Sequence, residues 1–263
     1  MRLRLFKLGV LLMLAGAQPS LAETPEEKGL RIAIEAETLD AGFRDYVVEG
    51  SMTLESQGAH QANREFTLSS LEVVDDGDKR LIVISHPPDV RGTVSLTYTH
   101  GLEPDDQWLY LPALRRTKRL SSRDKTGSFI GSEFTFEDLG SYELKKYTYK
   151  WLRDEEIDGH DCYVREDTPA YAYSGYARLV SWVDKENLRS RKIVYYDLQD
   201  RPLKELRFYD FQQYAGRHWR PDRVVMSNLQ NGNVSTIEWT NYRFGTGISE
   251  RDFAPTRLER VSR

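Results

Sequence analysis

The sequence contains a single cysteine, Cys162, among its 263 residues. A lone cysteine forms no intramolecular disulfide and cannot build a cysteine-rich zinc site. Neither charge dominates, because 37 lysines and arginines stand against 41 aspartates and glutamates, for a formal net charge of -4. This balance argues against a nucleic-acid partner. The hydrophobic content of 39% and aromatic content of 11% suffice for a packed core and exclude a disordered chain.

Catalytic motifs are also lacking. None of the five histidines belongs to a His-Glu-x-x-His pair, and there is no Gly-x-Ser-x-Gly elbow, P-loop or dinucleotide glycine fingerprint. We therefore expect no enzymatic activity, no catalytic residue, no metal site and no cofactor. His160 and Cys162 would share a strand face, but this pattern favours a buried, inert thiol over a nucleophile. The aspartates at 75, 76 and 78 lack the spacing of a calcium loop and indicate a polar turn.

The first residues have the pattern of a secretory signal peptide. Three cations precede the apolar run 8–15, and Ser20-Leu21-Ala22 has the small residues of a cleavage site. The run is shorter than the ~20 apolar residues of a membrane span, and no cysteine follows it to carry a lipid anchor. We expect a signal peptide at 1–22 and one exported, periplasmic domain at 23–263. An uncleaved anchor is the alternative.

A change of hydrophobic period organises the mature chain. Residues 24–41 begin with a capping box, continue with helical spacing and are followed by Gly42 as a stop. From Phe43 onward, apolar residues alternate with polar ones, as in strands with one apolar face. Turn sequences separate about eleven such strands, and an antiparallel sheet of that size must curl or split. We therefore predict one mainly β (α+β) domain whose opening helix plugs the concave side.

The segment 105–138 differs from plain scaffold. Six cations lie between Arg115 and Lys125 against one carboxylate, Asp124, and aromatic residues flank them. Such a patch suits an amphiphile with an anionic head group, because cations meet the head and apolar walls take the tail. A solvated hairpin with its basic residues on the outer face is the other interpretation.

Two stretches of this segment carry a family resemblance. Residues 108–115 (Trp-Leu-Tyr-Leu-Pro-Ala-Leu-Arg) and 128–138 (Ser-Phe-Ile-Gly-Ser-Glu-Phe-Thr-Phe-Glu-Asp) resemble the signature of the outer membrane lipoprotein-sorting protein-like family. This family is a branch of the LolA/LolB-like superfamily of Gram-negative bacteria. Shorter matches extend the resemblance over essentially the whole mature chain. Ile130 and Glu133 replace the usual Met and Asp and keep their chemical type. The shorter matches lie at 88–93, 158–163, 182–185, 195–197 and 257–260.

The resemblance implies a strongly curved, half-open, LolA-like β-barrel whose concave face is closed by helices around an apolar hollow. It implies a periplasmic carrier that moves a lipoprotein or lipid towards the outer membrane, working with an inner-membrane exporter of the RND type. The alternative is a periplasmic sensor or adaptor that binds such an exporter or a signalling partner without carrying cargo. We expect a monomer that contacts membranes transiently and binds no nucleic acid.

Burial of an acyl chain gives this interpretation its physical basis. Each methylene left in water costs roughly 0.8 kcal/mol, so a carrier needs an apolar shelter. A filled core is the alternative for every apolar residue that we assign to this shelter. The candidate acyl-chain residues are Tyr46, Val48, Met52, Val94, Leu96, Trp108, Tyr110, Leu111, Phe129, Ile130 and Phe134. The candidate contacts for a head group or a protein partner are Arg115, Arg116, Lys118 and Arg119.

Overall fold

The computed structural model describes residues 22–57, 59–74 and 76–263. The expected signal peptide lies outside the described residues apart from Ala22, and so does Asp75 of the expected acidic turn. In the described part of the chain, no helix combines the length and the apolar character needed to cross a membrane.

A single antiparallel sheet dominates the described residues and has thirteen strands, where the sequence predicted roughly eleven. The strands are β1 (Asp45–Ser56), β2 (Ala59–Leu71), β3 (Lys79–His86), β4 (Val94–Tyr98), β5 (Asp106–Leu111), β6 (Arg116–Arg119), β7 (Tyr147–Ile157), β8 (His160–Pro169), β9 (Arg178–Asp184), β10 (Ser190–Tyr196), β11 (Pro202–Tyr214), β12 (His218–Asn228) and β13 (Val234–Phe244).

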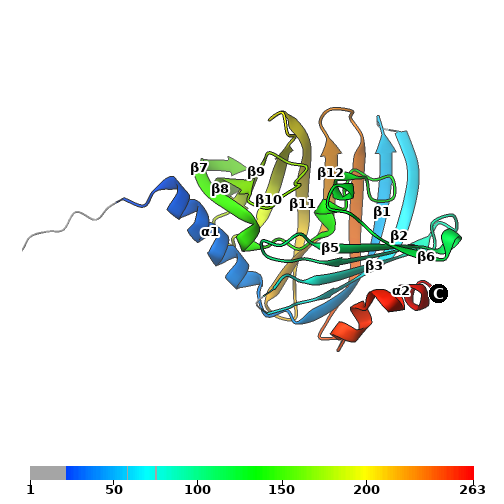
Figure 1. Ribbon diagram of the computed structural model, residues 1–263. Helices are drawn as coiled ribbons and strands as arrows, with labels where there is room; N and C mark the ends of the chain where they lie inside the picture. Colours follow the sequence, from blue (N-terminus) through cyan, green and yellow to red (C-terminus); the bar gives the residue numbers. More distant parts are fainter. Residues whose placement is uncertain (1–21, 58, 75) are drawn as a thin grey trace, which may run out of the picture.

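The strand order leaves the sheet open. It runs β6-β5-β4-β3-β2-β1-β13-β12-β11-β10-β9-β8-β7, so every neighbouring pair is consecutive in the sequence except β1 and β13 (Figure 1). The end strands β6 and β7 each pair on one side only, and the sheet curls between them. The predicted fold class, a curved and half-open antiparallel sheet, is confirmed.

Buried side chains gather on both faces of this sheet. Adjacent residues of a strand point to opposite faces, and on β3 Ile82 belongs to one cluster while Leu81 belongs to another. The inner cluster, on the face toward which the sheet curls, has as buried members Phe43, Tyr46, Val48, Met52, Leu54, Phe66, Leu68, Ile82, Ile84, Leu120, Phe129, Phe134, Phe136, Tyr176, Leu179, Tyr195, Leu206, Val224, Met226 and Ile237. The outer cluster has as buried members Leu81, Val94, Leu96, Tyr110, Phe253 and Leu258.

The C-terminal segment covers the outer cluster. It consists of the 3-10 turns η5 (Glu250–Phe253) and η6 (Pro255–Arg257) and the short helix α2 (Leu258–Val261). Phe253 and Leu258 are fully buried against β3, β4 and β5. The hydroxyl of Tyr98 donates to the Phe253 carbonyl at 2.7 Å, which fixes the segment to β4.

The opening helix, α1 (Pro25–Asp40), covers part of the inner face, as predicted. Its capping box is present, with the Thr24 side chain accepting from the Glu27 amide. Lys28 lies 3.6 Å from the centre of the Trp151 ring on β7, and Asp40 at the other end of the helix pairs with Arg220 of β12. The helix thus crosses from β7 toward β12 (Figure 1).

Gly29 sets how closely α1 approaches β7, and its replacement by alanine tests this contact. A Cβ atom at Gly29 would lie 2.7 Å from the Lys150 backbone nitrogen. Alanine is the better helix former by about 1 kcal/mol, so propensity alone predicts that Gly29→Ala stabilises the protein. We expect the opposite, a loss of about 1–3 kcal/mol in the free energy of unfolding, because backbone atoms cannot yield to the extra methyl.

Urea denaturation measures this effect, with Thr38→Ala on the exposed side of α1 as the control. A Gly29→Ala protein more stable than the wild type would show that the helix is free to move away from β7.

Candidate functional site

The inner face is closed by a segment that belongs to no strand of the sheet. We call residues 120–146 the plug. It contains the 3-10 turns η2 (Asp124–Thr126), η3 (Glu137–Leu139) and η4 (Leu144–Lys146), and one isolated bridge between Ser128 and Thr135. Ladder hydrogen bonds to the thirteen strands therefore do not hold it in place.

Three phenylalanines attach the plug to the sheet. Phe129, Phe134 and Phe136 are buried in the inner cluster. Phe129 and Phe136 pack edge to face, with their ring centres 5.7 Å apart. In the same cluster are Val48 and Met52 of β1. The expected apolar hollow is therefore occupied in this structure by the protein's own aromatic side chains.

An ion pair between the plug and β11 adds a polar anchor. The ammonium of Lys204 donates to the Asp138 carboxylate at 2.6 Å and to the Glu133 carbonyl at 3.0 Å. The side chains of Lys204 and Asp138 are only 3% and 5% exposed, so water does not screen the pair. The hydroxyl of Tyr176 also donates to Asp138, at 2.8 Å. Two acidic residues of the signature, Glu133 and Asp138, thus act as docking points.

The third acidic residue of the signature anchors the plug to the loop after β8. The Glu137 carboxylate accepts from the hydroxyls of Tyr171 and Ser174, at 2.5 and 2.6 Å, and from the Gly175 amide at 2.8 Å. Burial raises the pKa of Glu137, although these three donors oppose the shift.

A further pair of contacts joins the plug to the start of β5. The Asp105 carboxylate accepts from Lys146 at 2.5 Å and lies 4.0 Å from the ammonium of Lys125. Burial lowers the pKa of Lys125. Beside them, the Gln107 amide donates to the Phe136 carbonyl at 2.6 Å. Buried polar contacts therefore fix the plug at several points as well as through its phenylalanines.

The structure separates the apolar candidates into two groups. Tyr46, Val48, Met52, Phe129 and Phe134 belong to the inner cluster, and Ile130 is partly buried against it. The candidates Val94, Leu96, Trp108 and Tyr110 lie instead in or against the outer cluster, under the C-terminal segment. Leu111 is half-buried.

The four residues on the outer face correct our choice of face for β4 and β5. The alternation in these strands is as expected, but these four apolar residues face outward. Buried polar residues, Ser95, Thr97 and Gln107, occupy the inner face there. Val94, Leu96, Trp108 and Tyr110 therefore do not belong to an acyl-chain site on the inner face.

Three of the four basic candidates lie on β6, the strand at one end of the sheet, and Arg115 directly precedes it. Arg116, Lys118 and Arg119 belong to β6, and all of its residues are exposed. Arg119 pairs with Asp106, and Lys118 lies 3.8 Å from Asp124. None of these cations joins the inner or outer cluster. Their position matches that of a solvated hairpin.

Reasoning from the sequence missed Lys204, the partner of Asp138. Lys204 lies two residues before Leu206, so both point to the inner face of β11. A lysine at a position where the period calls for an apolar residue was the available signal. A second buried pair was missed in the same way: Arg165 and Asp167 on β8, which are 4% and 1% exposed.

Cys162 lies away from the inner face. It is fully buried in a third cluster with Val164 and Trp182, and burial raises the pKa of its thiol to about 11. An inert thiol, as the sequence indicated, fits this environment.

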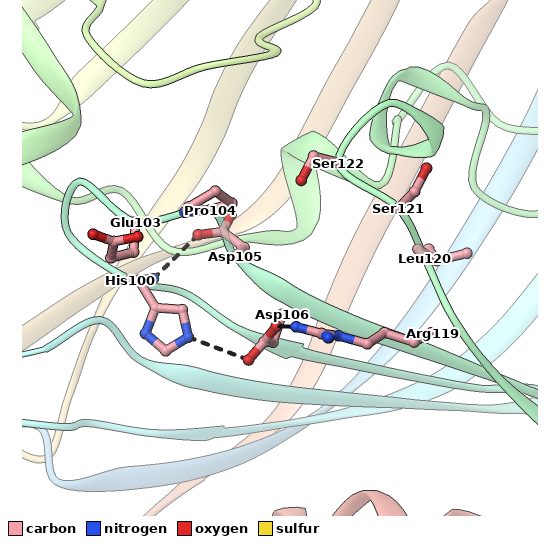
Figure 2. A pocket seen from close by; sticks show the side chains of 9 residues that line it. All are labelled: His100, Glu103, Pro104, Asp105, Asp106, Arg119, Leu120, Ser121 and Ser122. Carbon is pink, nitrogen blue, oxygen red and sulfur yellow. Dashed lines mark hydrogen bonds and ion pairs between the residues drawn. The ribbon is translucent and has the colours of Figure 1, made fainter.

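Two surface hollows stand out in the described part of the chain, and both are polar. The larger, about 660 Å³, lies beside the plug and is lined by residues that include His100, Asp105, Asp106 and Arg119 (Figure 2). His100 connects two carboxylates there, with its Nδ1 2.8 Å from Asp76 and its Nε2 3.7 Å from Asp106. The smaller hollow lies at the turn 159–161. Neither has the apolar walls that an acyl chain requires.

Solved structures of other proteins share this curled, open sheet. A LolA superfamily protein from Nitrosomonas europaea has this fold, with a TM-score of 0.68 at 22% identity over 86% of this chain and 97% of its own. A domain from Vibrio parahaemolyticus that is classed with outer membrane lipoprotein-sorting proteins is 42% identical, with a TM-score of 0.87 over 89% of this chain and 99% of its own. A DUF1329 family protein from Desulfovibrio piger is 31% identical, with a TM-score of 0.85 over the same shares.

A family model with the description "-like: Uncharacterized protein" matches residues 76–260. No protein with a curated description matches the sequence. On the similarity to the Vibrio and Desulfovibrio proteins, the chain belongs to the outer membrane lipoprotein-sorting protein-like family, and the resemblance found in the sequence is confirmed.

A double-mutant cycle tests the buried anchor between Asp138 and Lys204. We expect Asp138→Asn or Lys204→Met alone to lower the free energy of unfolding by about 3–5 kcal/mol, because each leaves one buried charge without its partner. The double variant Asp138→Asn/Lys204→Met should be clearly less destabilised than the sum of the two single changes.

The exposed pair of Arg223 and Asp210 is the control for this cycle, with a coupling of at most about 1 kcal/mol. Additive single effects at Asp138 and Lys204 would contradict the description of this pair as an anchor.

Glu137 should make the plug's attachment depend on pH. A carboxyl with a raised pKa binds its proton more tightly in the folded chain. Its contribution to stability is complete below the unfolded pKa and is lost as the pH rises through the folded pKa. Relative to Glu137→Gln, which does not titrate, the wild type should therefore lose stability over the pH range above the ordinary glutamate pKa of 4.5.

Urea denaturation across this range measures the difference, with Glu35→Gln on α1 as an exposed control. A wild type that gains stability relative to Glu137→Gln as the pH rises would reverse the assignment.

Proposed function

We propose that this protein is a periplasmic carrier that binds the acyl chains of a lipoprotein or a lipid at the inner face of its sheet. The plug supplies the observation that carries this proposal. Its backbone-to-backbone hydrogen bonds to the rest of the described chain lie only at its two ends, where the Leu120 amide donates to the Gln107 carbonyl and the Ala170 amide donates to the Lys146 carbonyl. Every neighbouring pair of strands, in contrast, is joined by a ladder. The plug can therefore leave the inner face while the sheet keeps all of its strand pairings.

The magnitudes favour exchange of the plug for cargo. Withdrawing the four buried side chains of the plug, three phenylalanines and Leu120, from the inner cluster costs roughly 1.5–3 kcal/mol each. An acyl chain of about sixteen methylenes gains on the order of 13 kcal/mol when it leaves water. The polar anchors add little to the cost of opening, because the ions of a buried pair recover their hydration once exposed. Cargo can thus replace the plug's contacts with a net gain.

The route of the cargo follows from the family and from the export pattern in the sequence. We infer that cleavage after Ala22 releases the chain into the periplasm without a lipid anchor, and that the monomer carries cargo from an inner-membrane exporter of the RND type towards the outer membrane. The relative from Vibrio, which is classed with lipoprotein-sorting proteins, supports this direction. We assign the chain no enzymatic activity.

The filled inner cluster favours a second function. If the plug stays in place, the protein is a periplasmic sensor or adaptor that binds an exporter or a signalling protein and carries no cargo. The two functions differ in whether the inner face accepts hydrocarbon.

Binding of a fluorescent fatty acid to delipidated protein distinguishes them. We expect the wild type to bind the probe and Phe134→Ala to bind it at least about tenfold more tightly, because the variant loses part of the packing that holds the plug closed. Phe253→Ala is the matched control, since Phe253 is equally a buried phenylalanine but lies in the outer cluster.

Two results would count against the carrier. Absence of probe binding in both the wild type and Phe134→Ala would favour the adaptor. Equal tightening by Phe253→Ala would show that general loosening, and not release of the plug, admits the probe.

A further inference from the structure

The turn between β5 and β6 forms an exposed tip at one end of the molecule. It includes the 3-10 turn η1 (Pro112–Leu114), and residues 113–119 are all exposed. Leu114 is 68% exposed. Figure 1 shows β6 and the C-terminus at the same side of the molecule.

The C-terminal helix lies directly beside this tip. A Cβ atom built on Gly92 would lie 2.8 Å from the Ser262 carbonyl oxygen and 3.6 Å from Pro112. The turn that holds Gly92, the tip and the end of α2 therefore meet at one place. Arg260 and Arg263 are exposed there.

Three cations at this end have no acidic partner in the described part of the chain. Within the described residues, no carboxylate lies within 4.0 Å of the guanidinium groups of Arg115, Arg116 or Arg260. Two further cations, Lys118 and Arg119, do have acidic partners on the neighbouring segments. The chain as a whole is acidic, with a net charge of -4, so these three unpaired arginines are opposite in sign to the whole chain.

We propose that the surface formed by Leu114, Arg115, Arg116 and Arg260 docks the protein onto an anionic phospholipid bilayer. Unpaired guanidinium groups attract lipid phosphates. An exposed leucine between them can enter the boundary between head groups and acyl chains. A purely acidic protein partner would use the cations and leave Leu114 in water. The proposal does not depend on cargo binding, because none of these residues belongs to the inner cluster.

Co-sedimentation with vesicles tests this surface. The mature protein should bind vesicles of phosphatidylglycerol mixed with phosphatidylethanolamine, and should not bind vesicles of phosphatidylcholine. Arg115→Glu/Arg116→Glu should weaken this binding at least about tenfold. Leu114→Ser should weaken it by a smaller factor and leave its salt dependence intact.

The matched control changes the same number of charges elsewhere. Lys150→Glu/Arg243→Glu replaces two exposed cations on β7 and β13 and should leave vesicle binding within about twofold of the wild type. Equal weakening by this control would reduce the effect to net charge and overturn the proposal. The proposal would also be overturned if the protein bound a polyglutamate peptide through Arg115 and Arg116 but did not bind the anionic vesicles.

The fatty-acid probe separates this proposal from the carrier function. Arg115→Glu/Arg116→Glu should bind the probe like the wild type, because the inner cluster is untouched. Loss of vesicle binding with intact probe binding supports the membrane surface alone, and loss of both would show that the variant has not folded as described.

Discussion

Closing the inner face of a sheet that has two free edges is the constraint on which the rest of this structure depends. A closed barrel would seal its interior with its own ladder, but β6 and β7 remain apart. The sheet has three covers of different kinds, and two of them close the inner face. Helix α1 crosses from β7 toward β12, the plug fills the centre, and the C-terminal segment covers the opposite face.

The covers differ in how they are held, and that difference bears on function. The C-terminal segment lies over a cluster with fully buried members such as Phe253 and Leu258, and α1 is pressed onto β7 at Gly29. The plug combines apolar contacts with ion pairs and hydrogen bonds to side chains. Polar anchors specify one docked position but contribute little net free energy compared with hydration. Of the three covers, the plug is therefore the one suited to reversible release.

The signature at 128–138 acquires a physical meaning from this arrangement. Its phenylalanines supply the apolar contacts, and its acidic residues Glu133, Glu137 and Asp138 each accept hydrogen bonds from a different part of the fold. A carboxylate at each point also explains why the usual residue at 133 can change from Asp to Glu, since both accept the hydrogen bond from Asn228. The motif encodes the docking of the plug.

Local periodicity predicted much of the fold and less of the site. The capping box placed α1, and alternation placed strands such as β1, because these signals lie within the elements themselves. The face was misjudged for Leu96 because both faces of β4 are buried, and the cover on its outer side comes from residues more than a hundred positions away. The partners Lys204 and Asp138 are also remote in sequence, 66 positions apart. Contacts between residues so far apart in the sequence leave only a weak signal in the local sequence pattern, such as a lysine at a position where an apolar residue is expected.

Hydrogen exchange of the plug's amides with and without a bound fatty acid tests the central claim most directly. If cargo takes the place of the plug, the amides of residues 120–146 lose protection on loading, while those of β1 and β13 keep theirs. Unchanged protection of the plug in a protein that holds the fatty acid would contradict the account, because cargo and plug would then occupy different places.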